Sequence, residues 1–369
     1  MVSEVLAELL QVPQELVVRL IWFGAVYVCP VAPLPHRDRV AALPEEQMAS
    51  IREVRKKALA KWGNDSRHQT PRRLSADEPV PEDGYLRAHM HPKRFPAAHS
   101  LAPEEWRRRI LAVREDHVVV SKPPGLQVPP TVDNVQESLL ACVERTLSLA
   151  PGSLNPAHRL DAGTEGIVVL TRTSSFASYF RELIGNKAQS GIRKQYRCLV
   201  VTAPPRELFN GEPLVHHVLE NQRRAGEMAH TVVVPEGTPG ALRCELIPEQ
   251  AEHVALSAEA VALWGVSAAH EVTLSLVTGR THQVRAQMAA IGLPLLGDRL
   301  YGELLNGKAR NGSAEQLHRG QAAEWCRGAL DQQLEPIALQ ASYGTRTGLD
   351  WRVFGYGIHA RASHFAALP

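Results

Sequence analysis

The alternation of apolar and polar positions divides the chain into an N-terminal helical part and a longer part in which strands and helices alternate. Over residues 3–27, apolar side chains recur with helical spacing on both sides of Pro13, which predicts two helices. Gly24 ends the second helix, and residues 25–30 then predict a short strand. The chain therefore opens with helix, turn, helix and strand.

This opening, taken as residues 1–30, resembles the S4-type RNA-binding module, and a small helical subdomain packed on the main body is the alternative. Residues 31–104 form a basic, proline-rich connecting region. Within it, residues 52–73 (REVRKKALAKWGNDSRHQTPRR) predict a helix followed by an exposed linker. Such a basic run is most often a solvated face, and direct contact with RNA is the alternative.

From about residue 105 the pattern changes to strands and helices without regular βαβ spacing, which predicts an α+β fold with a mixed, largely antiparallel sheet flanked by helices. Residues 205–270 are irregular and rich in Gly, Pro and Ala, which predicts an insertion or peripheral hairpins. Strands are expected at 110–125, 165–173, 194–201, 270–280, 337–342 and 351–354, and helices at 135–147, 174–184 (capped by Ser174 or Ser175) and 281–292 (capped by Thr281).

Composition narrows the class of protein only slightly. The formal net charge of +2 is too small to indicate a nucleic-acid partner by itself. No apolar run is long enough for a transmembrane helix, so we expect no membrane partner. The N-terminus does not resemble a signal or transit peptide, which favours the cytoplasm or nucleus; an organelle requires a transit peptide missing from this sequence. The cysteines lack metal-site spacing, so we expect neither zinc nor disulfides: Cys29, Cys142, Cys198, Cys244 and Cys326.

The stretch PAHRLDAGTEGIVVLTRT, residues 156–173, places Asp161 just before a predicted buried strand. Asp followed by Ala-Gly-Thr is ordinary turn chemistry, and on that basis alone a turn residue is the better interpretation. However, His158 and Arg159 bring donors and positive charge beside the carboxylate, and a carboxylate near arginine is held ionised, as a nucleophile or base must be.

A second polar cluster lies in TGRTHQVRAQMAAIGLPLLGDRLYG, residues 278–302. His282 and Arg285 stand three residues apart at the start of a predicted helix and are expected to share a face. Together with Arg280 they suit recognition of a phosphate or carboxylate, and a polar helix start at the surface is the alternative.

Taken together, these segments resemble the RluA-type family of RNA pseudouridine synthases. The segments SKPPGLQVPP, HRLDAGTEG, KQYRC, GRTHQVRAQ and GDRLYG follow the family's order, and the neighbouring HPKRFP and PPGLQVPPTVDN are most similar to its plant branch. The resemblance covers about residues 105–355 and implies a catalytic domain at 105–360.

The resemblance implies a role for each matching residue. Asp161 is the essential carboxylate, Tyr196 stacks beside the target uracil and helps proton transfer, and Arg285 pairs with Asp161. Arg159 fills the gap left by the flipped base. Glu165, Cys198 and Gln287 depart from the family's usual Ser, Ala and His. The remaining expected RNA contacts are His158, Arg280, Thr281, His282, Gln283 and Lys122.

The reaction implied by the resemblance needs no metal, redox partner or nucleotide, and neither GxGxxG nor GxxxxGK[ST] is present. We therefore expect no cofactor, an RNA substrate (tRNA or rRNA) and a monomer. Nucleophilic attack by Asp161 at C1′ and proton removal from C2′ both remain open. A catalytically silent RNA-binding protein of the same fold is the main alternative, and a base-releasing glycosidase is the third.

Overall fold

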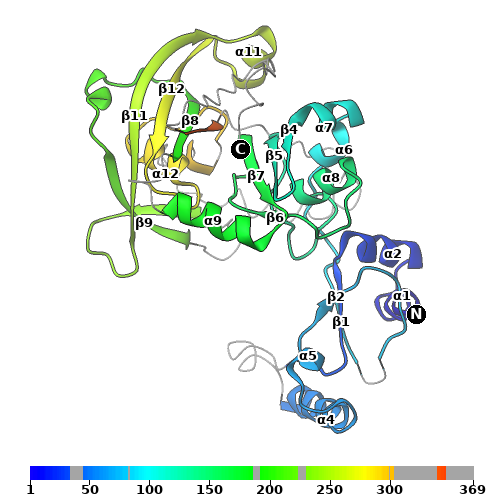
Figure 1. Cartoon of the computed structure of the whole chain (residues 1–369). Coiled ribbons are helices and arrows are strands. Elements are labelled where there is room, and N and C mark those ends of the chain that lie inside the picture. Colours follow the sequence, from blue (N-terminus) through cyan, green and yellow to red (C-terminus); the bar gives the residue numbers. More distant parts are fainter. Residues whose placement is uncertain are drawn as a thin grey trace. The chain divides into compact units, whose positions relative to one another are not determined.

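The computed structural model describes residues 1–33, 45–81, 84–185, 192–222, 230–298, 300–302 and 339–345. The strand predicted at 351–354 and Cys326 lie outside these ranges. The chain divides into two compact units. The first comprises residues 1–95 and 129–142, and the second comprises residues 96–128 and 143–369. Figure 1 shows the elements of both units, which are described one at a time here.

The first unit contains the two predicted helices, α1 (Val2–Leu10) and α2 (Gln14–Phe23), and the predicted strand, β1 (Val26–Cys29). Strand β1 lies between β2 (Arg72–Arg73) and β3 (Tyr85–Ala88), and both pairings are antiparallel. Val26 and Val28 pack with buried side chains of α1 and α2 in one apolar cluster. The basic region supplies α4 (Glu45–Trp62) and the short helix α5 (Ser66–Gln69).

The second unit contains a ten-stranded sheet within the described residues. The strand order is β10-β9-β11-β12-β8-β13-β7-β5-β4, and β6 pairs with β7 off this path. Only the β13–β7 pairing is parallel among those described, so the predicted α+β fold with a mixed, largely antiparallel sheet is confirmed. The strands are β4 (Ile110–Val113), β5 (His117–Lys122), β6 (Asn155–Pro156), β7 (Glu165–Thr171), β8 (Ile192–Val200), β9 (Leu214–Gln222), β10 (His230–Val234), β11 (Leu242–Ala255), β12 (Ala268–Leu276) and β13 (Leu339–Thr345).

Helices and turns complete this part of the fold. The helices are α6 (Ala97–Ser100), α7 (Pro103–Arg109), α8 (Leu139–Thr146), which crosses the boundary between the units, α9 (Ser174–Gly185), the 3₁₀ turn η1 (Arg206–Phe209), α11 (Ala258–Trp264) and α12 (Gln283–Ala290). Strands β5 and β7 are almost entirely buried, and they form the part of the sheet that leads directly to Asp161.

One predicted helix start and one predicted helix cap were wrong because another residue caps each helix, and the prediction for residues 205–270 was met only in part. The helix expected over 135–147 begins only at Leu139, because the Ser138 hydroxyl accepts a hydrogen bond from the Ala141 amide at the helix start. Helix α9 begins as predicted at Ser174, but the Thr173 hydroxyl accepts the hydrogen bond from the Phe176 amide. Residues 205–270, expected to be an insertion or peripheral hairpins, supply three strands of the main sheet.

Candidate functional site

Asp161 lies in the turn that connects β6 to β7, and the neighbouring loop after β5 holds this turn in place. The carbonyl of Ala162 accepts hydrogen bonds from the Gly125 amide (2.8 Å) and from Nζ of Lys122 (3.1 Å). Within the turn, the Thr164 amide donates to the Asp161 carbonyl at 3.1 Å. Gly166, the second residue of β7, has φ of 143°, a backbone conformation that a residue with a Cβ rarely adopts. The backbone position of Asp161 is therefore set from both sides.

Lys122 is fully buried and holds the Asp161 turn rather than presenting a charge to solvent. Its Nζ donates to the carbonyl oxygens of Pro123 (2.9 Å) and Leu126 (2.8 Å) as well as Ala162. Burial lowers the pKa of Lys122 to about 7, against the opposing effects of the Asp161 and Glu165 carboxylates. With all three bonds directed at the backbone, Lys122 offers no free donor to a ligand in this conformation.

His158 likewise faces the interior. Its Nε2 accepts a hydrogen bond from the Val169 amide at 3.0 Å, and its ring stacks on Phe180 with centroids 5.9 Å apart. Burial, together with the charge of Lys194, lowers the pKa of His158 to about 3. A neutral ring that accepts a backbone hydrogen bond serves to fix the turn against β7.

The start of α12 brings the second polar cluster of the sequence to Asp161. Oδ2 of Asp161 lies 3.7 Å from Nη1 of Arg285 and 3.9 Å from Nε2 of His282. The strongest contacts of Arg285 are with Asp298, to which Nε and Nη2 donate at 2.7 and 2.9 Å in a bidentate arrangement. Hydrogen bonding to Asp298 raises the pKa of the Arg285 guanidinium against the opposing effect of burial. Asp298 therefore orients the guanidinium that faces Asp161.

Helix α12 starts two residues later than the sequence predicts, and Thr281 does not cap it. His282 precedes the first helical residue with φ of 53° and ψ of 24°, a left-handed conformation that is uncommon outside glycine. As a result, His282 and Arg285 do not share a helical face. The left-handed turn instead directs the imidazole of His282 to the carboxylate that Arg285 also faces.

Two residues outside the predicted set complete this cluster. The ring of Tyr301 lies beneath the Arg285 guanidinium, 4.9 Å from its Cζ, and the Tyr301 hydroxyl is 3.1 Å from Nδ1 of His282. The Thr231 amide donates to the same hydroxyl at 2.9 Å, and the Thr231 hydroxyl donates to the Thr281 carbonyl. Asp298 and Tyr301 were missed although they belong to the GDRLYG segment, because a sequence match does not reveal which side chains it buries.

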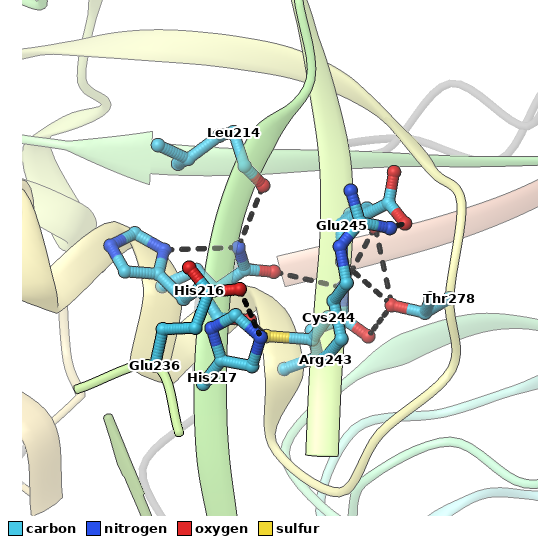
Figure 2. A network of polar contacts seen from close by, with 10 residues as sticks. Leu214, His216, His217, Glu236, Arg243, Cys244, Glu245 and Thr278 are labelled. Atoms are coloured by element: carbon cyan, nitrogen blue, oxygen red, sulfur yellow. Dashed lines mark hydrogen bonds and ion pairs between the residues drawn. The ribbon is translucent and has the colours of Figure 1, made fainter. Parts of the chain in front are cut away.

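Gln283 is buried and forms part of the support beneath the cluster. Its Oε1 accepts from the Thr278 hydroxyl and the Arg280 amide, and its Nε2 donates to the Glu245 carbonyl and to Gln287. Figure 2 shows the adjoining network, in which Thr278 contacts the backbone of Glu245 while Leu214, His216 and Cys244 lie on the neighbouring strands. With both ends of its amide engaged, Gln283 has no polar group directed at a ligand.

Tyr196 lies on β8, in the same row of the sheet as Lys122. Tyr196 pairs with Ala341 of β13, Ala341 with Gly166 of β7, and Gly166 with Lys122 of β5. Paired residues project to the same face of a sheet, and adjacent strands lie about 4.8 Å apart. The side chain of Tyr196 therefore projects from the sheet face on which Lys122 reaches the Asp161 turn. It is buried, with 8% of its surface exposed.

The residues predicted to contact RNA differ in how far they are exposed to solvent. Arg159 and Arg280 are exposed, and Thr281 is half-buried with its amide donating to Glu220 at 2.5 Å. Asp161, Arg285 and His282 thus form one cluster with Arg159 close by, since the Arg159 charge affects His282.

Glu165, which replaces the serine expected from the resemblance, is paired with a buried arginine. Oε1 of Glu165 lies 3.0 Å from Nη1 of Arg109, and Nε of Arg109 is 3.3 Å from Glu105. Arg109 also donates to the Ser121 carbonyl on β5. The added negative charge at the start of β7 is thereby neutralised within the fold.

Sequence comparisons with known proteins identify one family. A family model described as RNA pseudouridylate synthase matches residues 116–290. RNA pseudouridine synthase 6, chloroplastic, of Arabidopsis thaliana is 34% identical over 316 residues, which cover 82% of this chain but only 63% of that protein. The dual-specificity RNA pseudouridine synthase RluA of Escherichia coli is 29% identical over 201 residues, 54% of this chain and 78% of that protein. Human RNA Pseudouridylate Synthase Domain Containing 1 aligns with a TM-score of 0.43 and 18% identity, covering 66% and 80% of the two chains.

Proposed function

Because the chain belongs to the RluA-type family of RNA pseudouridine synthases, near its plant branch, we propose that it is an isomerase that converts uridines in RNA to pseudouridine. The chain spans less than two thirds of the Arabidopsis relative, so the activity is inferred from the part that matches. The reaction breaks the bond from uracil N1 to ribose C1′ and forms a new bond from C5 to C1′. C5 releases its proton and N1 takes one up, so the product is an isomer of the substrate.

The observation that carries the proposal is the environment of Asp161. Its carboxylate ends the turn into a buried strand and faces a guanidinium and an imidazole at 3.7 and 3.9 Å. The guanidinium places a positive charge beside the carboxylate that reacts, and Asp298 holds that guanidinium in position. Asp161 is therefore the reacting carboxylate in this proposal.

Other residues take supporting roles in the same proposal. Tyr196 packs beside the target uracil from the adjoining part of the sheet, and the exposed Arg159 occupies the space left by the flipped base, for which a planar guanidinium is well suited. Arg280, Thr281 and His282 contact the RNA around the target. Lys122, His158 and Gln283, predicted as RNA contacts, act instead from within the fold, since their polar atoms are bonded there.

The decisive experiment uses cellular RNA labelled with tritium at uridine C5. The protein is expected to release tritium, and Asp161→Asn is expected to abolish release while leaving RNA binding nearly unchanged, because removing a negative charge does not weaken attraction to phosphates. Glu207→Gln, which neutralises an exposed carboxylate of the second unit, is the matched control and should retain full activity. Turnover by Asp161→Asn near the parent rate would contradict the assignment.

The same RNA distinguishes the two alternative functions. A catalytically silent RNA-binding protein binds the RNA and releases no tritium from any cellular pool. A glycosidase releases free uracil and leaves an abasic ribose, which mass spectrometry detects as a loss of mass. Isomerisation leaves the mass of the RNA unchanged.

We further propose that residues 1–30 form an S4-like RNA-binding module, residues 31–104 a connecting region and residues 105–360 the catalytic domain. The supporting observation is the order of α1, α2 and β1. Charge reversal of exposed basic residues between 52 and 73 should reduce the salt dependence of RNA binding if this segment contacts phosphates. An unchanged slope would indicate a solvated face.

The substrate is proposed to be tRNA or rRNA and the active form a monomer. Pseudouridine maps of total RNA with and without the gene identify the substrate, and sedimentation tests the oligomeric state.

No helix of the described residues has the length and apolar character needed to cross a membrane. The chloroplastic Arabidopsis relative supports the organellar location, while the N-terminal sequence favours cytoplasm or nucleus. Imaging of the tagged gene product decides between them.

A further inference from the structure

Tyr301, in the segment GDRLYG, has no role in the proposed reaction, yet it contacts both neighbours of Asp161. Tyr301 is 3% exposed, its ring lies against the Arg285 guanidinium, and its hydroxyl meets His282. Its own amide donates to Asp298 at 3.3 Å, which ties the tyrosine to the carboxylate that orients Arg285. One buried side chain is thus in contact with both the guanidinium and the imidazole that face Asp161.

The hydrogen bonds around the Tyr301 hydroxyl indicate where its proton points. A backbone amide can only donate, so the Thr231 amide uses an acceptor position of the phenol oxygen. The phenol proton then needs an acceptor, and Nδ1 of His282 lies 3.1 Å away. The Thr231 side chain also interacts with Tyr301, and its hydroxyl can still accept a proton while it donates to the Thr281 carbonyl at 2.7 Å. Among the side-chain contacts of the phenol oxygen described above, Nδ1 of His282 is the acceptor at hydrogen-bond distance.

If Nδ1 accepts the phenol proton, the hydrogen of the neutral imidazole must be on Nε2. Nε2 is the ring nitrogen that lies 3.9 Å from Oδ2 of Asp161. We therefore propose that Tyr301 is a positioning residue that fixes His282 as its Nε2–H tautomer and so turns a neutral N–H donor toward Asp161.

The surroundings of His282 favour a neutral ring in this arrangement. Burial lowers the pKa of His282, and the charges of Arg285 and Arg159 lower it further, while Asp161 and Asp298 act in the opposite direction. The left-handed backbone at His282 is held by the bonds of Thr281 to Glu220 and Thr231. The imidazole thus supplies a donor beside the carboxylate without adding a second full positive charge to that of Arg285.

The tautomer can be read directly from the free protein. In protein labelled with ¹⁵N in the imidazole rings, long-range ¹H–¹⁵N correlation at pH 7.5 should show His282 with a protonated Nε2 and an unprotonated Nδ1, assigned by its loss in His282→Gln. Tyr301→Phe keeps the ring over Arg285 but removes the hydroxyl, and it should convert the pattern to a mixture of tautomers. Tyr179→Phe, which alters an exposed tyrosine, should leave the pattern unchanged.

An Nδ1–H tautomer or an imidazolium in the parent protein would overturn the proposal, and so would an unaltered spectrum in Tyr301→Phe. The measurement on the parent protein decides the tautomer even if Tyr301→Phe does not fold. The catalytic consequence rests on the proposed function: loss of one hydrogen bond should lower kcat about tenfold with KM nearly constant. Failure of tritium release by the parent protein would refute the function and leave the spectroscopic result standing.

Discussion

The buried imidazole of His158 should make the second unit sensitive to acid. In the folded protein its Nε2 accepts the Val169 amide, which only the neutral ring can do, and its pKa is lowered to about 3. In the unfolded chain the ordinary value is about 6.5. As the pH falls through 6.5, His158 binds a proton in the unfolded state but stays neutral in the folded state. The stability that the neutral ring contributes is therefore fully present above pH 6.5 and is lost between pH 6.5 and 3.

The size of the effect follows from these two values. Lowering the pH from 7.5 to 5.0 should reduce the free energy of unfolding by about 2 kcal/mol through His158 alone. Urea unfolding followed by circular dichroism at both pH values measures the loss. His158→Gln should be less stable at pH 7.5, because the ring is lost, but its stability should fall by about 2 kcal/mol less on acidification.

The control is His99→Gln, which replaces an exposed histidine in the same unit and should retain the acid loss of the parent. If His158→Gln loses as much stability between pH 7.5 and 5.0 as the parent protein does, the imidazole is not held neutral and the argument from its contact with Val169 is refuted.

Two further predictions concern the ion pairs around the site. Asp298→Asn should lower the free energy of unfolding by about 2 kcal/mol in urea and slow tritium release, because the buried Arg285 loses its charged partner; parent-like stability would show that Asp298 does not anchor the guanidinium. Arg109→Met should lower the free energy of unfolding by about 1 to 2 kcal/mol. This is less than for a fully buried ion pair, because Glu165 is partly exposed to solvent. Glu165→Ser should reduce the free energy of unfolding by less in the Arg109→Met protein than in the parent protein. Strictly additive effects of the two substitutions would contradict a direct pairing.

The sequence predicts buried strands such as β7 and which residues meet at Asp161. It does not predict the hydrogen bonds that fix these residues in position. Apolar runs such as 165–173 identify buried strands because burial on both faces leaves an uninterrupted apolar pattern. The meeting of Asp161 with Arg285 follows from the family resemblance, but the closer bond from Arg285 to Asp298 does not, since it joins two side chains that are 13 residues apart and on different segments.

Long-range contacts account for the other differences. Residues 205–270 appear irregular because their strands are interrupted by Gly, Pro and polar residues, and only pairing with β12 and with each other makes them strands. The sequence predicts that Lys122, His158 and Gln283 contact RNA from the surface, because polar side chains are usually exposed. Lys122 and Gln283 are buried and His158 is half-buried, and backbone groups or neighbouring side chains form hydrogen bonds with all three side chains.

The position of β13 has a consequence for how the protein is made. Residues 339–345 lie between β7, which follows Asp161, and β8, which carries Tyr196. A ribosome therefore makes the Asp161 turn with β7, and β8 with Tyr196, well before it makes the strand that joins β7 to β8. At about 5 to 20 residues per second, roughly 140 further residues after Tyr196 take several seconds to synthesise. During that interval the edges of β7 and β8 that pair with β13 lack this strand, and the nascent protein depends on its own β13 to reach them before another strand does.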